Sequence, residues 1–217
     1  MRTKTLLLTA VALVTGFLAI NSQAQSNVYS ANIVGYVNVT NEANDYALLA
    51  NPLDNGTNDL ISLLPSVPNG TQVLVFTGGV LQSSSKTKGV WSSDFIITPG
   101  TGFFLKNPAN GTNTFVGQVD FANNGISTNV LDCPAGTSVL AGSPIPFSGL
   151  LSDTGTNTMN LNVLPNGSTI NVLVSGTLQQ SSKTKGVWSE NFTITPGEGF
   201  YVKSPTATNI IQVLNVQ

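Results

Sequence analysis

An internal repeat is the feature that most constrains how this 217-residue chain folds. Residues 82–92 (QSSSKTKGVWS) return almost unchanged as residues 179–189 (QQSSKTKGVWS), 97 positions later. The turn triplet TPG keeps the same spacing, at residues 98–100 and 195–197. Self-similarity at a fixed period indicates a repeated structural unit. The chain is therefore expected to contain two tandem repeats of about 95 residues.

The repeat extends beyond this segment and sets the predicted domain boundaries. Residues 54–58 (DNGTN) correspond to residues 153–157 (DTGTN), with small shifts along the chain. No linker rich in proline or glycine separates the copies, so the two units are expected to pack together. We assign residues 25–122 to the first repeat and residues 123–217 to the second.

Each repeat has the signals of short β-strands separated by turns. Residues 72–76 (QVLVF) are rich in β-forming residues and are followed by two glycines, and residues 170–174 repeat this pattern. Residues 60–64 follow an Asn-Asp capping pair and stop at Pro65, which predicts one short helix, with a counterpart at residues 159–164. The prediction is an all-β fold in which each repeat is a small β-sandwich or open barrel with one short helix.

The first 24 residues have the pattern of a secretory signal peptide. Arg2 and Lys4 precede a largely apolar run from residue 5 to residue 20, and small residues at positions 22 and 24 predict a cut after Ala24. The run is shorter than the roughly 20 residues that a helix needs to cross a bilayer. No later stretch is apolar enough to span one. We predict an exported protein of the extracellular space, cell surface or periplasm, with no membrane span in the mature chain.

Charge and composition exclude several classes of function. Without Arg2 and Lys4 the chain has 6 basic and 10 acidic residues, a net charge of −4, and no histidine. Nucleic acid is not an expected partner, because no basic patch can neutralise its phosphates. Without histidine, neither a Ser-His-Asp triad nor the usual nitrogen ligand of zinc can be built. The single cysteine, Cys133, cannot form an intrachain disulfide and is expected to be a buried thiol.

The acidic residues form no recurring catalytic pair. Asp94 aligns with Asn191, and Glu190 aligns with Ser93, whereas glycoside hydrolysis needs two positioned carboxyl groups. The motif at residues 54–58 offers oxygen ligands for calcium, but a turn leading into a helix cap accounts for every residue in it. We predict a protein that is not an enzyme and has no cofactor or metal. The open alternative is a site between the repeats, built from Asp120, Asp132 or Glu198.

The repeated Lys-Thr-Lys-Gly-Val-Trp segments are the candidate binding site. Side chains alternate along an extended segment, so Lys86 and Lys88 are expected to point to the same side. An aromatic face beside amides and hydroxyls can stack on a sugar ring. The competing interpretation is that the tryptophans are core residues and the lysines keep strand edges soluble. The candidate ligand-binding residues are Lys86, Lys88, Trp91, Lys183, Lys185 and Trp188.

Further segments carry a resemblance to a known group of proteins. These are residues 28–38 (VYSANIVGYVN), residues 48–53 (LLANPL), and the Pro-Gly-x-Gly-Phe elements at residues 99–103 and 196–200. With them the chain resembles a group of uncharacterised secreted two-repeat β-proteins of the planctomycete–verrucomicrobial type. The resemblance spans most of the mature chain. It implies an exported two-repeat β-protein and brings no established activity or site residues.

The leading prediction is a noncatalytic extracellular or cell-envelope protein with a structural or adhesive role. Its expected partners are polysaccharide or other envelope proteins. The alternative is a carbohydrate-binding module that uses the loops around Trp91 and Trp188. The sequence leaves the ligand and the oligomeric state open.

Overall fold

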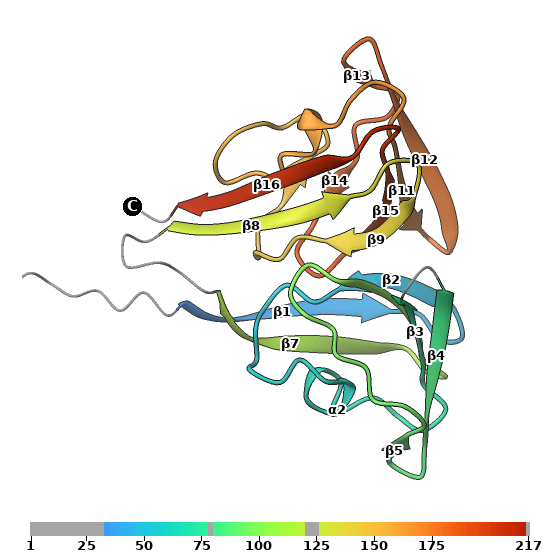
Figure 1. The fold of residues 1–217 in the computed structure, drawn as a ribbon. Coiled ribbons are helices and arrows are strands. Elements are labelled where there is room, and N and C mark those ends of the chain that lie inside the picture. The colour runs from blue at the N-terminus through green and yellow to red at the C-terminus, as the bar shows by residue number, and fades with distance from the viewer. Residues whose placement is uncertain (1–32, 78–79, 120–125, 216–217) are drawn as a thin grey trace, which may run out of the picture. The chain divides into compact units, whose positions relative to one another are not determined.

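The computed structural model describes residues 33–77, 80–119 and 126–215. The predicted signal peptide, residues 1–24, and the predicted boundary between the repeats, at residues 122 and 123, lie outside the described residues. Ala31–Gln217 form one compact unit, and its described part is built mainly of strands (Figure 1). The all-β prediction is confirmed. Within these described residues, no helix has the length and apolar character needed to cross a bilayer.

The described residues between 33 and 119, which we call the first repeat after the sequence pattern, contain a five-stranded sheet, a two-stranded ribbon and one short helix. The sheet has the order β2-β6-β3-β4-β5, and each neighbouring pair is antiparallel. The first and last strands of the repeat, β1 and β7, pair along their whole length (Figure 1). The elements are β1 (Ile33–Asn41), β2 (Tyr46–Ala50), α2 (Leu60–Leu63), β3 (Gln72–Thr77), β4 (Val80–Thr87), β5 (Val90–Trp91), β6 (Gly102–Lys106) and β7 (Gly111–Val119).

The second repeat has the same order of equivalent strands. Its five-stranded sheet runs β9-β15-β11-β12-β13, and its first and last strands, β8 and β16, again form a two-stranded ribbon. A further short pair, β10 and β14, corresponds in the first repeat to a single bridge between Asp59 and Ile96. The elements are β8 (Ile126–Cys133), β9 (Ser138–Gly142), β10 (Gly149–Leu150), η1 (Leu161–Val163), β11 (Thr169–Val174), β12 (Thr177–Thr184), β13 (Val187–Trp188), β14 (Thr193–Ile194), β15 (Gly199–Lys203) and β16 (Thr208–Asn215).

One of the two predicted helices is present as expected, and the other is shorter and of a different type. Helix α2 forms as expected, and its N-cap residue Asp59 accepts a hydrogen bond from the N–H of Ser62 at 2.7 Å. The predicted counterpart at residues 159–164 is only the 3₁₀ turn η1. Asn160, directly before it, has a φ of 52° and no side-chain capping bond. A right-handed helix cannot continue through a residue in this left-handed conformation.

Each repeat has its own hydrophobic core. In the first, Phe115 of the ribbon packs edge to face against Phe103 of the sheet, with the two ring centroids 6.3 Å apart. Leu60 of α2 belongs to the same hydrophobic cluster. In the second, Ile210 of the ribbon and Phe200 of the sheet are fully buried in one cluster. Burial of these apolar side chains is the main favourable contribution to folding.

Cys133 lies at the end of β8, inside the second core. Its thiol is buried, which confirms the prediction. Burial, together with the nearby charge of Asp132, raises the pKa of the thiol from 9.0 to about 11. The reactive thiolate is therefore scarce at neutral pH.

The two repeats contact each other through equivalent residues. The N–H of Ala50 donates to the carbonyl of Gly197 at 2.9 Å, and the N–H of Gly142 donates to the carbonyl of Gly100 at 3.0 Å. Ala50 and Gly142 hold the same position at the ends of β2 and β9. Two isolated antiparallel bridges are equivalent in the same way: Leu49 pairs with Glu198, and Ala141 pairs with Thr101. Such self-complementary contact is typical of a two-fold interface between identical subunits.

Three glycines permit this close approach because a side chain would not fit. A Cβ on Gly142 would collide with the Cβ of Ala50. A Cβ on Gly199 would lie 2.5 Å from the carbonyl oxygen of Leu49. A Cβ on Gly102 would lie 2.8 Å from a backbone nitrogen of β9. Backbone atoms cannot move aside as a flexible side chain can, so all three positions require glycine.

We predict that Gly142→Ala destabilises the protein by about 1–3 kcal/mol, the usual cost of inserting a methyl group into a packed site. Gly35→Ala is the matched control, because Gly35 is also in a strand and its added Cβ would meet nothing closer than 4.0 Å. Urea denaturation of both variants measures the difference. Equal stability of the two variants would contradict the assigned contact.

Candidate functional site

The repeated Lys-Thr-Lys-Gly-Val-Trp segments form two equivalent β-hairpins. Lys88 and Gly89 make the two-residue turn between β4 and β5, with φ values of 51° and 82°. Lys185 and Gly186 make the same turn between β12 and β13, with φ values of 52° and 80°. Positive φ at both central residues is what a type I′ hairpin turn requires. In each repeat the glycine N–H donates to an asparagine side chain at 2.7 Å, Asn69 in the first and Asn166 in the second.

The two tryptophans are core residues. Trp91 and Trp188 are 7% and 6% exposed, and each belongs to the hydrophobic cluster of its own repeat. The exposed ring faces expected of a sugar platform are therefore not at the surface. Each indole Nε1 is buried and makes no hydrogen bond with a described residue.

Lys86 and Lys183 turn inward beside these rings. The Nζ of Lys86 donates to the carbonyls of Pro65 and Val67, at 3.2 and 3.0 Å, and lies 5.9 Å from the ring centre of Trp91. The Nζ of Lys183 donates to the carbonyl of Asn162 in the equivalent segment and lies 5.7 Å from the ring centre of Trp188. Desolvation by burial lowers the pKa of Lys183. We call these two arrangements the Lys–Trp pairs.

Lys88 and Lys185 are separated from the Lys–Trp pairs. The expectation that Lys86 and Lys88 point to the same side is wrong, because β4 ends at Thr87 and Lys88 already lies in the turn. Lys88 and Lys185 are exposed at the hairpin tips, each beside an exposed valine. The six candidate residues thus comprise two buried tryptophans, two inward lysines and two exposed lysines.

Three of the acidic side chains that the sequence singled out, those of Asp54, Asp94 and Glu198, accept hydrogen bonds from backbone N–H groups, and Asp120 lies outside the described residues. Asp94 accepts the N–H of Leu60 at 2.9 Å, and its counterpart Asn191 accepts the N–H of Ser152 at 3.0 Å. In the Asp-x-Gly-Thr-Asn motif, Asp54 accepts the N–H of Gly56 at 2.8 Å, as in a turn. Among the described residues, no group of three or more acidic or cysteine side chains is arranged to hold a metal ion.

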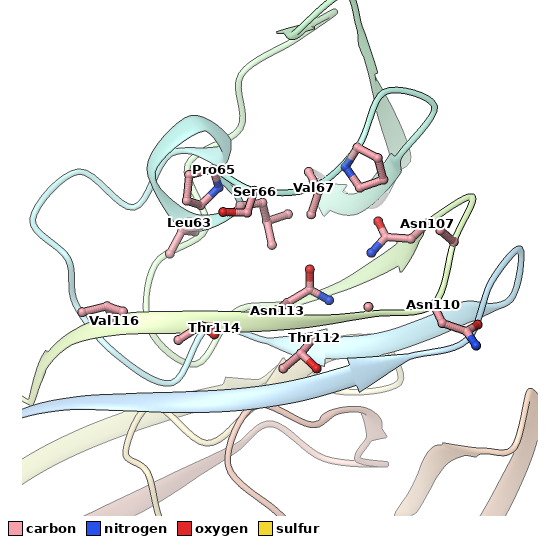
Figure 2. Close-up of a pocket in the computed structure, with 14 residues that line it drawn as sticks. Leu63, Pro65, Ser66, Val67, Asn107, Asn110, Thr112, Asn113, Thr114 and Val116 are labelled. Carbon is pink, nitrogen blue, oxygen red and sulfur yellow. The ribbon is translucent and has the colours of Figure 1, made fainter.

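A groove of about 380 Å³ lies beside β7 in the first repeat, and no motif in the sequence indicates it. One wall is the segment 63–68, and the other is β7 with the loop before it (Figure 2). The lining includes amides, hydroxyls and aliphatic side chains but no charged side chain. We call it the β7 groove. Its principal polar side chains are Ser66, Asn107, Asn110, Thr112, Asn113 and Thr114.

A buried amide network supports the floor of the β7 groove. The Oδ1 of Asn41 accepts from the Nδ2 atoms of Asn107 and Asn113, at 2.8 and 3.0 Å. The hydroxyl of Thr71 donates to Asn107 at 2.9 Å. These bonds fix the amide of Asn113, whose oxygen points toward the segment containing Ser66 (Figure 2). Buried polar networks of this kind hold side chains in one geometry when their groups are paired.

The second repeat replaces this network with smaller or apolar groups. From the strand registers, Cys133 occupies the position equivalent to Asn41, and Ile210 occupies the position equivalent to Asn113. Ile210 is fully buried in the second core. Among the described residues, the amide floor is therefore a property of the first repeat alone.

We predict that Lys183→Ala destabilises the protein by about 1–3 kcal/mol, because hydrogen bonds to charged groups contribute that much and a carbonyl would be left unpaired. Lys185→Ala is the matched control: the same residue type two positions away, exposed in the turn, with an expected change within about 0.5 kcal/mol. Urea denaturation provides the comparison. If Lys183→Ala is as stable as Lys185→Ala, the inward cation does not stabilise the fold.

Comparison with known proteins adds no functional information to this geometry. No protein-family model matches the chain, no curated protein is significantly similar to it, and no solved structure matches it significantly. The Lys–Trp pairs and the β7 groove must therefore be interpreted from their own contacts.

Proposed function

We propose that this chain is a noncatalytic exported protein with a structural or adhesive role in the cell envelope or outside the cell. The β7 groove is the observation that carries the proposal. Its neutral amides and hydroxyls lie beside aliphatic side chains, with no charged group in the lining. Such a surface suits an uncharged extended chain, because its polar groups can be matched by hydrogen bonds without desolvation of an ion.

The local roles of the carboxylates support a noncatalytic role. Asp59, Asp94 and Asp153 each accept a hydrogen bond from a backbone N–H. Hydrogen bonds from Ser62 lower the pKa of Asp59, whereas a general acid at neutral pH needs a raised one. The replacement of Asp94 by Asn191 keeps the equivalent backbone bond. The charge of Asp94 is thus not needed for its structural role.

The outward face of the β1–β7 ribbon also supports contact with neutral partners. Tyr36 lies directly opposite Val116, and both are largely exposed. Next to them, Thr114 donates to the side chain of Asn38 at 2.7 Å. A face of this composition can contact polysaccharide or another envelope protein without burying a charge.

Cell fractionation and sedimentation test this proposal together. In the producing cells, the protein is expected in the envelope or extracellular fraction and to be accessible to protease added outside. The purified protein is expected to self-associate as its concentration rises. A strictly periplasmic protein that stays monomeric at every concentration would overturn the structural role.

A second candidate function is carbohydrate binding at a small cavity beside Trp188. The cavity has a volume of about 190 Å³, and its polar lining comes from Ser152, Asn162 and Asn191. An indole edge beside two amides and a hydroxyl can recognise a sugar ring. The residues at this cavity differ from their counterparts in the first repeat, where Asp94 replaces Asn191.

Tryptophan fluorescence tests this second candidate. In Trp91→Phe, Trp188 is the remaining tryptophan, and a polysaccharide in the cavity is expected to shift its emission and reduce its quenching by acrylamide. Trp188→Phe is the matched control and should show no such response. If no polysaccharide changes the signal of Trp91→Phe, the cavity is not a carbohydrate site.

A further inference from the structure

The outer edge of β7 is open where it faces the β7 groove. In an antiparallel pair, residues alternate between bonding the partner strand and directing their backbone groups away from it. Gln118 directs them away from β1, because its N–H and C=O bond to Asp54 at 2.8 and 2.9 Å. Thr112, Thr114 and Val116 share this orientation by alternation. No hydrogen bond joins their outward backbone groups to any described residue.

The second repeat closes the same edge of its last strand, β16. The N–H of Asn157 donates to the carbonyl of Val213 at 2.7 Å, and the Nδ2 of Asn160 donates to the carbonyl of Ile211 at 2.8 Å. The side chain of Asn157 also bonds both backbone groups of Asn215. The carbonyls of Ile211 and Val213 are the counterparts of the outward carbonyls of Thr114 and Val116 in β7. Proteins usually cover such edges because an open edge recruits another strand.

We propose that the open edge of β7 binds residues 25–32 of a second copy of this chain as an added β-strand. The backbone groups of Thr112, Thr114 and Val116 would pair with the incoming strand. Alternate side chains of that strand would face Leu63, Val67 and the amide of Asn113. The inference rests on the proposed structural role and identifies the contact that would link one copy to the next.

The chemistry of residues 25–32 (QSNVYSAN) matches the groove. The segment carries no charge, as the uncharged lining requires, and it contains the β-forming pair Val28-Tyr29. Its eight residues are enough to cover the five-residue edge from Thr112 to Val116. Residues 120–125, the other stretch of comparable length outside the described strands, carry the charge of Asp120.

Chain geometry favours a second copy over the same molecule. Ile33 pairs with Val119, so its own preceding segment would start at the far end of β7 from Thr112. From Ile33 the segment would first have to pass β7, a distance of two strand spacings. It would then have to run along the outer edge of β7 from Val119 to Thr112, which is seven positions, and pass Asp54, which is paired with Gln118. At about 3.3 Å per residue this path takes about ten residues. With the predicted cut after Ala24, only eight precede Ile33.

The test is sedimentation velocity on the purified protein and on two proline variants. Thr114→Pro removes an outward N–H and leaves the backbone bonds between β1 and β7 intact, although the side-chain bond from Thr114 to Asn38 is lost. Ile211→Pro, at the equivalent position of the closed edge, is the matched control. Thr114→Pro is expected to weaken self-association about tenfold, since one strand-pairing bond is lost and the ring obstructs the edge. Ile211→Pro should associate as the unmodified protein does.

A synthetic peptide provides an independent measurement that does not depend on the folding of a variant. A fluorescent peptide of residues 25–32 is expected to bind the protein and to dissociate its oligomers, whereas the same peptide N-methylated at Ser30 should bind about tenfold more weakly. If self-association persists unchanged in Thr114→Pro and the peptide does not bind, the β7 edge is not the contact, although the structural role stands. If the unmodified protein does not self-associate, both proposals fail.

Discussion

The close backbone contact between the two repeats is the constraint around which the rest of this unit is arranged. Gly102, Gly142 and Gly199 lie where a Cβ would meet the opposing repeat, so the chain has no alternative residue at these points. The strands that carry them, β6, β9 and β15, also hold core residues such as Phe103 and Phe200. Any displacement at the contact would therefore be transmitted into both cores, because packed interiors do not deform continuously.

The Lys–Trp pairs explain why one segment stayed nearly identical in both copies. Lys86 donates to backbone carbonyls just after α2, Lys183 donates to a carbonyl within η1, and the adjacent tryptophans fill the cores. Lysine is suited to this place because its long stem crosses an apolar region while its ammonium group reaches several acceptors. Identity between repeats here follows from a shared structural requirement, so it does not by itself identify a ligand site.

The sequence predicted the all-β fold class and the local strands and turns better than it predicted the candidate functional site. Strand signals at residues 72–76 and the cap at Asp59 depend on neighbours along the chain, and both are present. The helix expected at residues 159–164 is shortened to the 3₁₀ helix η1, because Asn160 adopts a left-handed conformation that residue type alone does not dictate. The β7 groove was missed for a different reason. It depends on Asn41, Asn107 and Asn113, which come together only when the first and last strands of the repeat pair.

The difference between the repeats is as informative as their similarity. In the second copy, Ile210 and Cys133 complete an apolar core, and two asparagines cover the edge of β16. In the first, amides occupy the equivalent core positions, and no described residue bonds the outward backbone groups of Thr112, Thr114 and Val116 in β7. Buried amides and an open edge both cost stability or solubility, and the second copy demonstrates that this fold does not need them. The first copy retains both features in the same groove. That coincidence is the physical reason why we propose the β7 groove, and not its counterpart in the second copy, as the functional site.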